Sequence, residues 1–192
     1  GNNGIVWATD EPLKLSTIPY WYSLGKFKSG FLSDFSFVTN GKTGYAISSS
    51  GSLMRFKNIG ADLKVEATEI AASSFNGRYG TGVYVDPGNP NNLAVTLGNY
   101  GNNDYVFLST NAFGLSPSFT SIQHNLPKMP VYAVVMLPDN PEHYVIVGTE
   151  LGVWSYNKNT ECWTEFSNEM GRTPVFRLIL KDMKTVGCKV LY

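Results

Sequence analysis

The sequence predicts an all-β fold: a β-propeller of four-stranded antiparallel blades, with about four blades present. Three observations predict it. One motif occurs twice, as VYVDPGNPNNLAVTLG at 83–98 and VVMLPDNPEHYVIVGT at 134–149, and Pro90 and Pro141 are at a spacing of 51 residues. Weaker copies lie on both sides of this pair. No long stretch has the periodicity of a helix, and a period of about 40–50 residues is typical of propeller blades.

The repeat extends over most of the chain. FSFVTNGKTGYAIS at 35–48 aligns with the first motif at a spacing of 48 residues. PVFRLILKD at 174–182 aligns with PVYAVVMLP at 130–138 at a spacing of 44. A β-sandwich or a solenoid of similar strands is the alternative reading of this pattern.

Each copy has the same order of elements: an apolar run, a turn rich in Pro, Asn, Asp and Gly, a second apolar run, a glycine turn, a third strand and a weaker fourth strand. Proline fixes φ, and Asn and Gly tolerate left-handed geometry, so these turns are tight. One such sheet cannot bury both of its faces, which favours stacked blades. The predicted strands are 35–39, 81–85, 132–136 and 176–180 (first), 44–47, 93–96 and 144–148 (second), 53–56, 105–109 and 153–156 (third), and 119–123 and 163–166 (fourth).

The repeat also predicts the domain organisation, a single propeller region over residues 1–192. A seven-bladed ring would need roughly 340 residues at this period. We therefore expect part of a larger ring, with the remaining blades of the parent propeller as partners. The expected units are a partial blade at 1–27, blades at 28–76, 77–127 and 128–172, and a partial blade at 173–192.

Composition narrows the function classes. Hydrophobic residues make up 43% of the chain and charged residues only 16%. The 15 Lys and Arg balance the 15 Asp and Glu, so no charge excess attracts nucleic acid or an anionic membrane. The longest apolar stretch is too short to insert into a bilayer. The low charge and the abundance of Asn, Gly, Ser and Tyr favour an exported protein that is secreted, periplasmic or on the cell surface.

The two cysteines, Cys162 and Cys188, are expected to be buried, unpaired thiols, because free cysteine behaves as a small hydrophobe. A disulfide between them is the alternative. Two lone cysteines and two scattered histidines lack the spacing of metal ligands, so we predict neither a metal site nor a cofactor.

Two motifs carry a resemblance to a known family. One is D-P-x-N-P at 86–90, found less fully at 137–141, and the other is GTELGVWSYNKNTECW at 148–163. The second is similar to the pattern G-T-x-x-G-V-a-x-S-x-D-x-G-x-x-W, where "a" is apolar or aromatic. The chain thus resembles the Asp-box (BNR-type) propellers, which include sialidases, xyloglucanase-type glycoside hydrolases, the sortilin ectodomain and a photosystem II assembly factor.

The resemblance implies a structural role for the Asp-box residues, in a hairpin between the third and fourth strands. An Asp or Asn side chain accepts hydrogen bonds from local backbone amides there, and a Trp packs into the blade. In this chain Asn replaces Asp, one extra residue precedes the Trp, and Phe119 takes the Trp role in the earlier blade. The matching positions are Ser109, Asn111, Ser155, Asn157, Asn159 and Trp163.

Ligand sites in this fold lie on the face formed by the blade-crossing loops and the loops between second and third strands. The loop LGNYGNND at 97–104 carries five extra residues relative to the next blade, because Ser109 and Ser155 are 46 apart and the preceding strands repeat at 51. Its tyrosine and amides suit a sugar, and arginines could bind carboxylates or sulfates. An ordinary surface loop with solvated arginines is the alternative. The candidates are Arg78, Tyr79, Asn99, Tyr100, Asn102, Asn103, Asp104, Glu150 and Arg172.

We therefore expect a scaffold-type propeller module that binds a glycan or a protein. The alternative is a portion of a xyloglucanase-type glycoside hydrolase. Asp10, Asp104 and Glu150 are available acids, but none lies in a catalytic pattern, and the arginines do not form the triad of a sialidase. Catalytic residues remain unassigned, and the sequence leaves open whether the chain is an enzyme.

Overall fold

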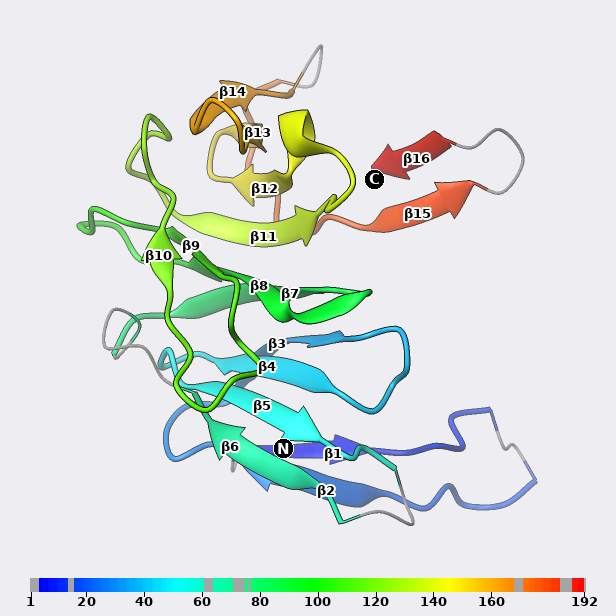
Figure 1. The fold of residues 1–192 in the computed structure, drawn as a ribbon. Helices are drawn as coiled ribbons and strands as arrows, with labels where there is room; N and C mark the ends of the chain where they lie inside the picture. Colours follow the sequence, from blue (N-terminus) through cyan, green and yellow to red (C-terminus); the bar gives the residue numbers. More distant parts are fainter. Residues whose placement is uncertain are drawn as a thin grey trace.

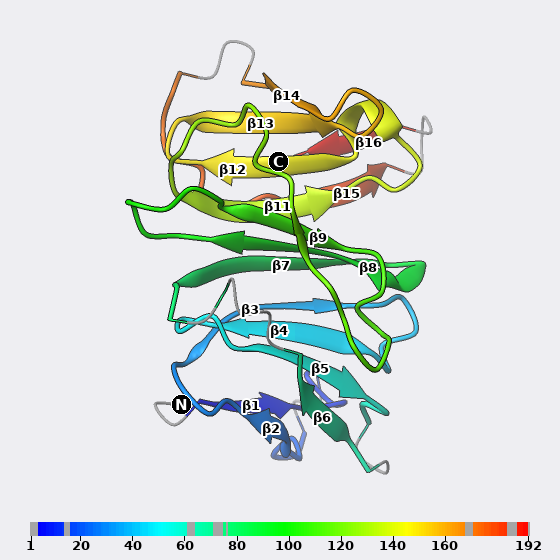
Figure 2. The same cartoon turned by 60° about the vertical axis from the view of Figure 1, so that its left-hand side comes forward.

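The computed structural model describes residues 4–13, 16–60, 64–70, 75, 77–167, 171–183 and 188–191. The described chain forms five antiparallel sheets, of which three have four strands and two have two. The sheets are stacked one after another in chain order (Figures 1 and 2). The predicted all-β architecture of repeated four-stranded sheets is confirmed.

Each four-stranded sheet is a meander in which consecutive strands pair. A two-stranded sheet precedes the three, and another follows them. The 3-10 turn η2 (Pro141–His143) joins β11 to β12. The strands are β1 (Ile5–Ala8) and β2 (Tyr22–Lys26); β3 (Leu32–Phe37), β4 (Gly44–Ser48), β5 (Leu53–Lys57) and β6 (Glu66–Glu69); β7 (Gly80–Asp86), β8 (Asn89–Leu97), β9 (Val106–Ser109) and β10 (Thr120–Ser121); β11 (Val131–Met136), β12 (Val145–Thr149), β13 (Gly152–Asn157) and β14 (Cys162–Glu165); β15 (Leu180–Met183) and β16 (Cys188–Leu191).

The first strands of neighbouring sheets lie side by side. β7 contacts both β3 and β11. Side chains of β3 bind the backbone of β7: Asp34 accepts a hydrogen bond from the Val83 amide at 2.9 Å, and Ser36 accepts one from the Val85 amide at 3.0 Å. These two bonds satisfy backbone amides of β7 that have no strand partner on that side, and they fix the β3–β6 sheet relative to the β7–β10 sheet.

Apolar layers between the sheets make the core. One cluster joins the β7–β10 and β11–β14 sheets and contains the fully buried Tyr105 and Trp163. A second joins the β3–β6 and β7–β10 sheets and contains Tyr45 and Phe75. Large aromatic side chains thus fill the space between sheets, as expected when each sheet buries its faces only against its neighbours.

Two local predictions were wrong. The strand expected at 176–180 begins only at Leu180, because the preceding segment binds the previous sheet: the Val175 amide donates to the Thr149 carbonyl oxygen at 2.9 Å. Cys162 is exposed rather than buried, because it starts β14 at the end of a hairpin. The side chain of Cys188, and therefore its pairing, lies outside the described residues.

Within the described ranges, no helix is long and apolar enough to cross a bilayer.

Candidate functional site

The two ends of the strands form two different faces. The turn face, on the right in Figure 1, carries the turns from first to second strand and the hairpins from third to fourth strand. The loop face, on the left, carries the loops from second to third strand and the crossings between sheets. The 98–105 loop between β8 and β9 therefore shares the loop face with the segments that lead into β3, β7 and β11.

A cavity of about 560 Å³ opens at the loop face, where the first strands begin. We call it the aromatic basin. Five aromatic residues from separate segments of the chain contribute to its wall, and among the residues that the structure describes no Lys or Arg does. The lining residues are Phe31, Leu32, Ser33, Tyr79, Thr81, Gly98, Asn99, Tyr100, Pro130, Tyr132 and Phe176.

The aromatic rings of the basin form two contacting pairs with one exposed ring beside them. Phe31 and Tyr79 meet edge to face at 6.4 Å between ring centroids, and Tyr132 lies 4.8 Å from Phe176. Tyr100 is 65% exposed and Phe176 69%. Exposed aromatics gathered in a concave surface are unusual in a soluble protein and mark interaction sites.

A carboxylate lies behind two of these tyrosines. The hydroxyl of Tyr132 donates a hydrogen bond to the carboxylate of Glu150. That bond, followed by burial and the charge of Glu150, raises the pKa of Tyr132 to about 12. Desolvation and then the same charge raise the pKa of Tyr100. Both phenols therefore remain protonated near neutral pH and act as hydrogen-bond donors rather than nucleophiles.

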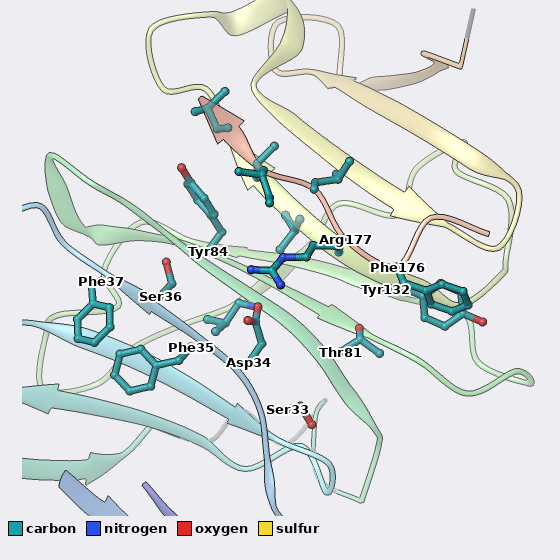
Figure 3. Close-up of a pocket in the computed structure, with 17 residues that line it drawn as sticks. Ser33, Asp34, Phe35, Ser36, Phe37, Thr81, Tyr84, Tyr132, Phe176 and Arg177 are labelled. Atoms are coloured by element: carbon teal, nitrogen blue, oxygen red, sulfur yellow. The ribbon is translucent and has the colours of Figure 1, made fainter. Parts of the chain in front are cut away.

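A second cavity, of about 570 Å³, runs along the first strands from the basin (Figure 3). β3, β7, β11 and residues 176–180 line it, and Tyr132 and Phe176 belong to both cavities. Its acidic residue is Asp34, which accepts the backbone bond from Val83. Burial raises the pKa of Asp34, against the lowering effects of backbone hydrogen bonds and of Arg177. Asp34 thus holds two sheets together.

Arg78 supports the loop after β8 instead of facing the basin. Its Nη1 donates to the Asp104 carbonyl oxygen at 2.6 Å, and its guanidinium lies 5.3 Å from the centroid of the Tyr105 ring. Burial lowers the pKa of Arg78. The expected alternative, a solvated surface arginine, does not describe this half-buried side chain.

The side chains of the predicted amide platform are largely hydrogen-bonded, within their own loop or to the segment at 121–128. The Asn102 side chain donates to the Asn99 carbonyl oxygen at 2.9 Å. Asn103 accepts a hydrogen bond from Lys128, and Asp104 accepts one from Ser121. Of these amide and acid residues, only Asn99 lines the basin.

The remaining predicted site residues lie either at the aromatic basin or at the outer strand β14. Tyr79 and Tyr100 line the basin, and Glu150 contacts it through Tyr132. Arg172 instead pairs with Glu165 of β14, an outer strand, at 3.0 Å. The structure therefore brings Tyr79, Asn99, Tyr100 and Glu150 together and leaves Arg172 apart.

Sequence reasoning missed Phe31, Tyr132 and Phe176. A signal for them was present in the repeat. Phe31 and Tyr79 are 48 residues apart, and Tyr132 and Phe176 are 44 apart, which are the spacings of the aligned copies. Each pair therefore occupies one repeat position, at or just before a first strand, where matched side chains point to the same region of the ring.

The hairpins from third to fourth strand lie on the turn face and are closed by asparagine. In one hairpin, Asn111 Oδ1 accepts from the Ser118 amide at 2.8 Å, and Asn111 also bonds Ser109. In the other, Asn157 Oδ1 accepts from the amides of Asn159 at 2.9 Å and Thr160 at 3.1 Å.

The other two positions of the second hairpin are bound to different segments. Ser155 pairs with His143 at 2.7 Å. Trp163 is buried, and its Nε1 donates to the Ile122 carbonyl oxygen at 2.6 Å. These contacts anchor β13 and β14 to η2 and to the end of β10. In the described part of the chain, no three His, Cys, Asp or Glu side chains are grouped as metal ligands would be.

No protein-family model matches the chain, and a search of curated proteins finds no match. Solved structures do match. The Myceliophteria thermophila Cps50 (Swd1) β-propeller domain aligns with 81% of this chain at 13% identity and a TM-score of 0.58. The chain has a β-propeller fold.

Other matches agree with this fold. Chaetomium thermophilum Sqt1, bound to the N-terminus of ribosomal protein L10, aligns with 93% of the chain at 13% identity and a TM-score of 0.62. A Niastella koreensis GH74 enzyme aligns with 78% at 15% identity and a TM-score of 0.53. The chain spans 47% of the Cps50 domain and of Sqt1, and 24% of the GH74 enzyme. At these identities the likeness concerns the fold alone.

Proposed function

We propose that this propeller module binds a protein partner through the aromatic basin of its loop face and serves as a recognition scaffold within a larger exported protein. The observation that carries the proposal is the gathering of five aromatic side chains from separate segments around one open cavity of about 560 Å³. Burial of exposed aromatic surface is the commonest source of binding energy at the centre of a protein interface.

The chemistry of the basin supports a polypeptide ligand. Its rings offer apolar area, and the polar side chains of Asn99 and Tyr100 also line it. Tyrosine and phenylalanine supply a large contact area at a small cost in conformational entropy. The related fold of Sqt1, bound to the N-terminus of ribosomal protein L10, is an example of a propeller with a peptide ligand.

A glycan is the less favoured ligand of the two that the sequence suggested. Sugar recognition requires several polar groups aimed at hydroxyls in addition to a stacking ring. Asn102, Asn103 and Asp104, which would have supplied them, are hydrogen-bonded within or next to their own loop. The basin therefore offers stacking without a dense set of free amides.

A glycoside hydrolase portion has still less support. An inverting or retaining glycosidase needs two carboxyl groups flanking the bond. The described lining of the basin contains no carboxylate, and the lining of the second cavity contains Asp34 alone, which is bonded to the Val83 amide. The GH74 neighbour supports the propeller architecture and not this activity.

The finer family assignment is also a proposal. The hydrogen bonds of Asn111 and Asn157 to backbone amides support an Asp-box role for these hairpins, with Asn in place of Asp. Export is supported by the charged fraction of 16%, which is low against a typical quarter or so.

Selection of peptide ligands tests the proposed function. A random peptide library is selected on the immobilised full chain, and binding of the enriched peptides is then measured by calorimetry on variants. We expect Tyr100→Ala to weaken binding about tenfold or more, which corresponds to about 1.4 kcal/mol and is typical of losing an aromatic hot spot. Tyr20→Ala is the matched control, because Tyr20 is 64% exposed and does not line the basin.

A glycan array probed with the same protein gives the competing outcome. Peptides that bind the Tyr100→Ala variant as tightly as the parent chain would contradict a site in the basin. Glycan binding that depends on Tyr100, with no Tyr100-dependent peptide, would replace the protein partner with a sugar.

A further inference from the structure

The charge around the aromatic basin is unbalanced. Among the described residues no Lys or Arg lines it, and behind its wall lies Glu150, whose carboxylate accepts a hydrogen bond from the Tyr132 hydroxyl. Neighbouring cations on the loop face have other partners. Arg78 is bound to the Asp104 carbonyl oxygen, and Lys128 to Asn103. Arg172 is paired with Glu165 on the outer strand. Arg177 lines the adjoining second cavity, where its charge acts on Asp34. Among the described residues, the Glu150 carboxylate therefore lies next to the basin with no Lys or Arg paired to it.

Glu150 retains capacity to bind a ligand. Its backbone amide donates to the carbonyl oxygen of Pro130, a lining residue of the basin, at 3.1 Å, which holds Glu150 next to the basin wall. An ionised carboxylate has two oxygens and about four acceptor sites, and tyrosine hydroxyls use only part of this capacity. The residue is half-buried, so water screens its charge less than that of a surface carboxylate.

The aromatic rings, like the carboxylate, attract a positively charged group. Tyr132 and Phe176 lie 4.8 Å apart on the wall that adjoins Glu150, and Tyr100 is close enough to Glu150 for its pKa to be raised by that charge. The faces of aromatic rings carry negative electrostatic potential and attract a cation within about 6 Å. Carboxylate and rings together therefore favour a positively charged group over a neutral group of the same shape.

We propose that the aromatic basin receives a positively charged group of the partner peptide, with its charge at Glu150 and its aliphatic part against Tyr132, Phe176 and Tyr100. Lys, Arg and a free N-terminal amine share this chemistry, and each has an aliphatic stem or neighbour that the rings can cover. This inference rests on the proposed function and specifies the ligand class of the same site.

Four small probes test the inference on the full chain. Nα-acetyl-lysine amide, Nα-acetyl-arginine amide and norleucine amide with a free amine represent the three cationic sources, and Nα-acetyl-norleucine amide is the neutral probe. Affinities are measured by NMR titration of backbone amides. We expect at least one cationic probe to bind about tenfold tighter than the neutral probe, with shifts at residues of the basin. Which cationic probe binds best identifies the source of the charge.

Two matched acid variants decide the role of the carboxylate. Glu150→Gln should abolish most of the tenfold preference while leaving binding of the neutral probe unchanged. Glu142→Gln removes an exposed acid on the turn face and should preserve the preference. The amide spectrum of each variant establishes that it is folded before titration.

Equal affinity for charged and neutral probes would overturn the inference, and so would a preference that persists in Glu150→Gln. The proposed function is tested separately. Selected peptides that need Tyr100 but carry no positive charge at the site would retain the protein-binding function and reject the cationic ligand. Absence of any Tyr100-dependent peptide would reject the function itself.

Discussion

The turn face and the loop face end the same strands in opposite ways. On the turn face, side chains satisfy the local backbone: Asp86 accepts from the Gly88 amide at 2.9 Å, and Asn140 accepts from the amides of Glu142 and His143. On the loop face, aromatic side chains such as Tyr100 and Phe176 remain exposed around a cavity. The comparison indicates that side chains of the turn face stabilise the fold, whereas the loop face leaves aromatic surface exposed.

The two connections of β8 illustrate the difference: the turn at 87–88 before it lies on the turn face, and the 98–105 loop after it lies on the loop face. A tight turn between adjacent strands leaves backbone amides that only its own side chains can reach, so Asp, Asn and Pro are used there. The longer connection after β8 is held by hydrogen bonds of Arg78 and Asn102, and its Tyr100 side chain remains 65% exposed. Loops of this kind on a rigid scaffold are the usual place for binding residues.

Trp163→Ala, in the hairpin of the β11–β14 sheet, should have the largest effect on stability and would sharpen this comparison. The indole is buried and bonded to the Ile122 carbonyl oxygen, so its loss leaves a cavity and an unpaired acceptor. We expect the free energy of unfolding to fall by about 3–5 kcal/mol in urea titrations. Trp7→Ala, at a 51% exposed position, is the control and should cost far less. Similar losses for both variants would contradict the packing role.

Gly51→Ala could break the comparison, because Gly51 lies on the loop face and its backbone conformation is needed for the fold. Gly51 has a φ of 78°, and an added Cβ would lie 1.8 Å from the Phe75 carbonyl oxygen. We expect a loss of about 3 kcal/mol in unfolding free energy, at the upper end for local backbone strain. Gly41→Ala isolates the dihedral cost of about 1–2 kcal/mol, since Gly41 has a φ of 67° and open space around it. Equal losses would mean that the close approach has no effect.

Asp86→Ala tests the turn face directly. The buried carboxylate accepts from the Gly88 amide and from the Asn92 side chain at 3.0 Å. Removing it should cost about 1–3 kcal/mol of unfolding free energy, the range for unsatisfied buried donors. Peptide binding at the basin should be unchanged, as measured by calorimetry. Asn89→Ala removes one exposed acceptor in the same turn and should cost less; weakened binding in either variant would connect the two faces.

The smallest effect on stability is expected from Glu150→Gln, within about 0.5 kcal/mol at neutral pH. The substitution should instead change the ionisation of tyrosine hydroxyls at alkaline pH, which ultraviolet absorbance measures. The part of the absorbance change that comes from Tyr132 should move from a pKa of about 12 toward the ordinary value of 10.0. Tyr132→Phe identifies that part, because the pKa of Tyr22 is also raised to about 12. An unchanged absorbance curve in Glu150→Gln would contradict the hydrogen bond.

The same pair gives a stability dependence on pH. A pKa raised in the folded state means that the folded chain keeps a proton that the unfolded chain loses above pH 10.0. Stability from this group is therefore complete below pH 10.0 and decreases as the pH rises toward 12. Denaturation of the parent chain and of Tyr132→Phe across this interval should show the steeper decline in the parent chain.

Strand order and turn chemistry were largely predictable, but part of the site was not. The strands around 93–96 and 153–156 and the turn at 86–90 follow from local alternation and proline spacing. The amide set was predicted as a platform because it lies in a long loop. A sequence cannot indicate that Lys128 and Ser121, far along the chain, take up Asn103 and Asp104. Tyr132 was overlooked because it lies within an apolar run that reads as core.

The sequence by itself determined a series of like strands closed by Pro, Asn and Gly turns, since these depend on neighbouring residues and on a repeat visible in one dimension. Only the tertiary structure decided which side chains meet. Stacking the sheets brings Phe31, Tyr79, Tyr132 and Phe176 to one end of the first strands and places Glu150 against Tyr132. That convergence depends on contacts between residues far apart in sequence, such as Tyr132 and Phe176, which are 44 positions apart, and on the space left between sheets.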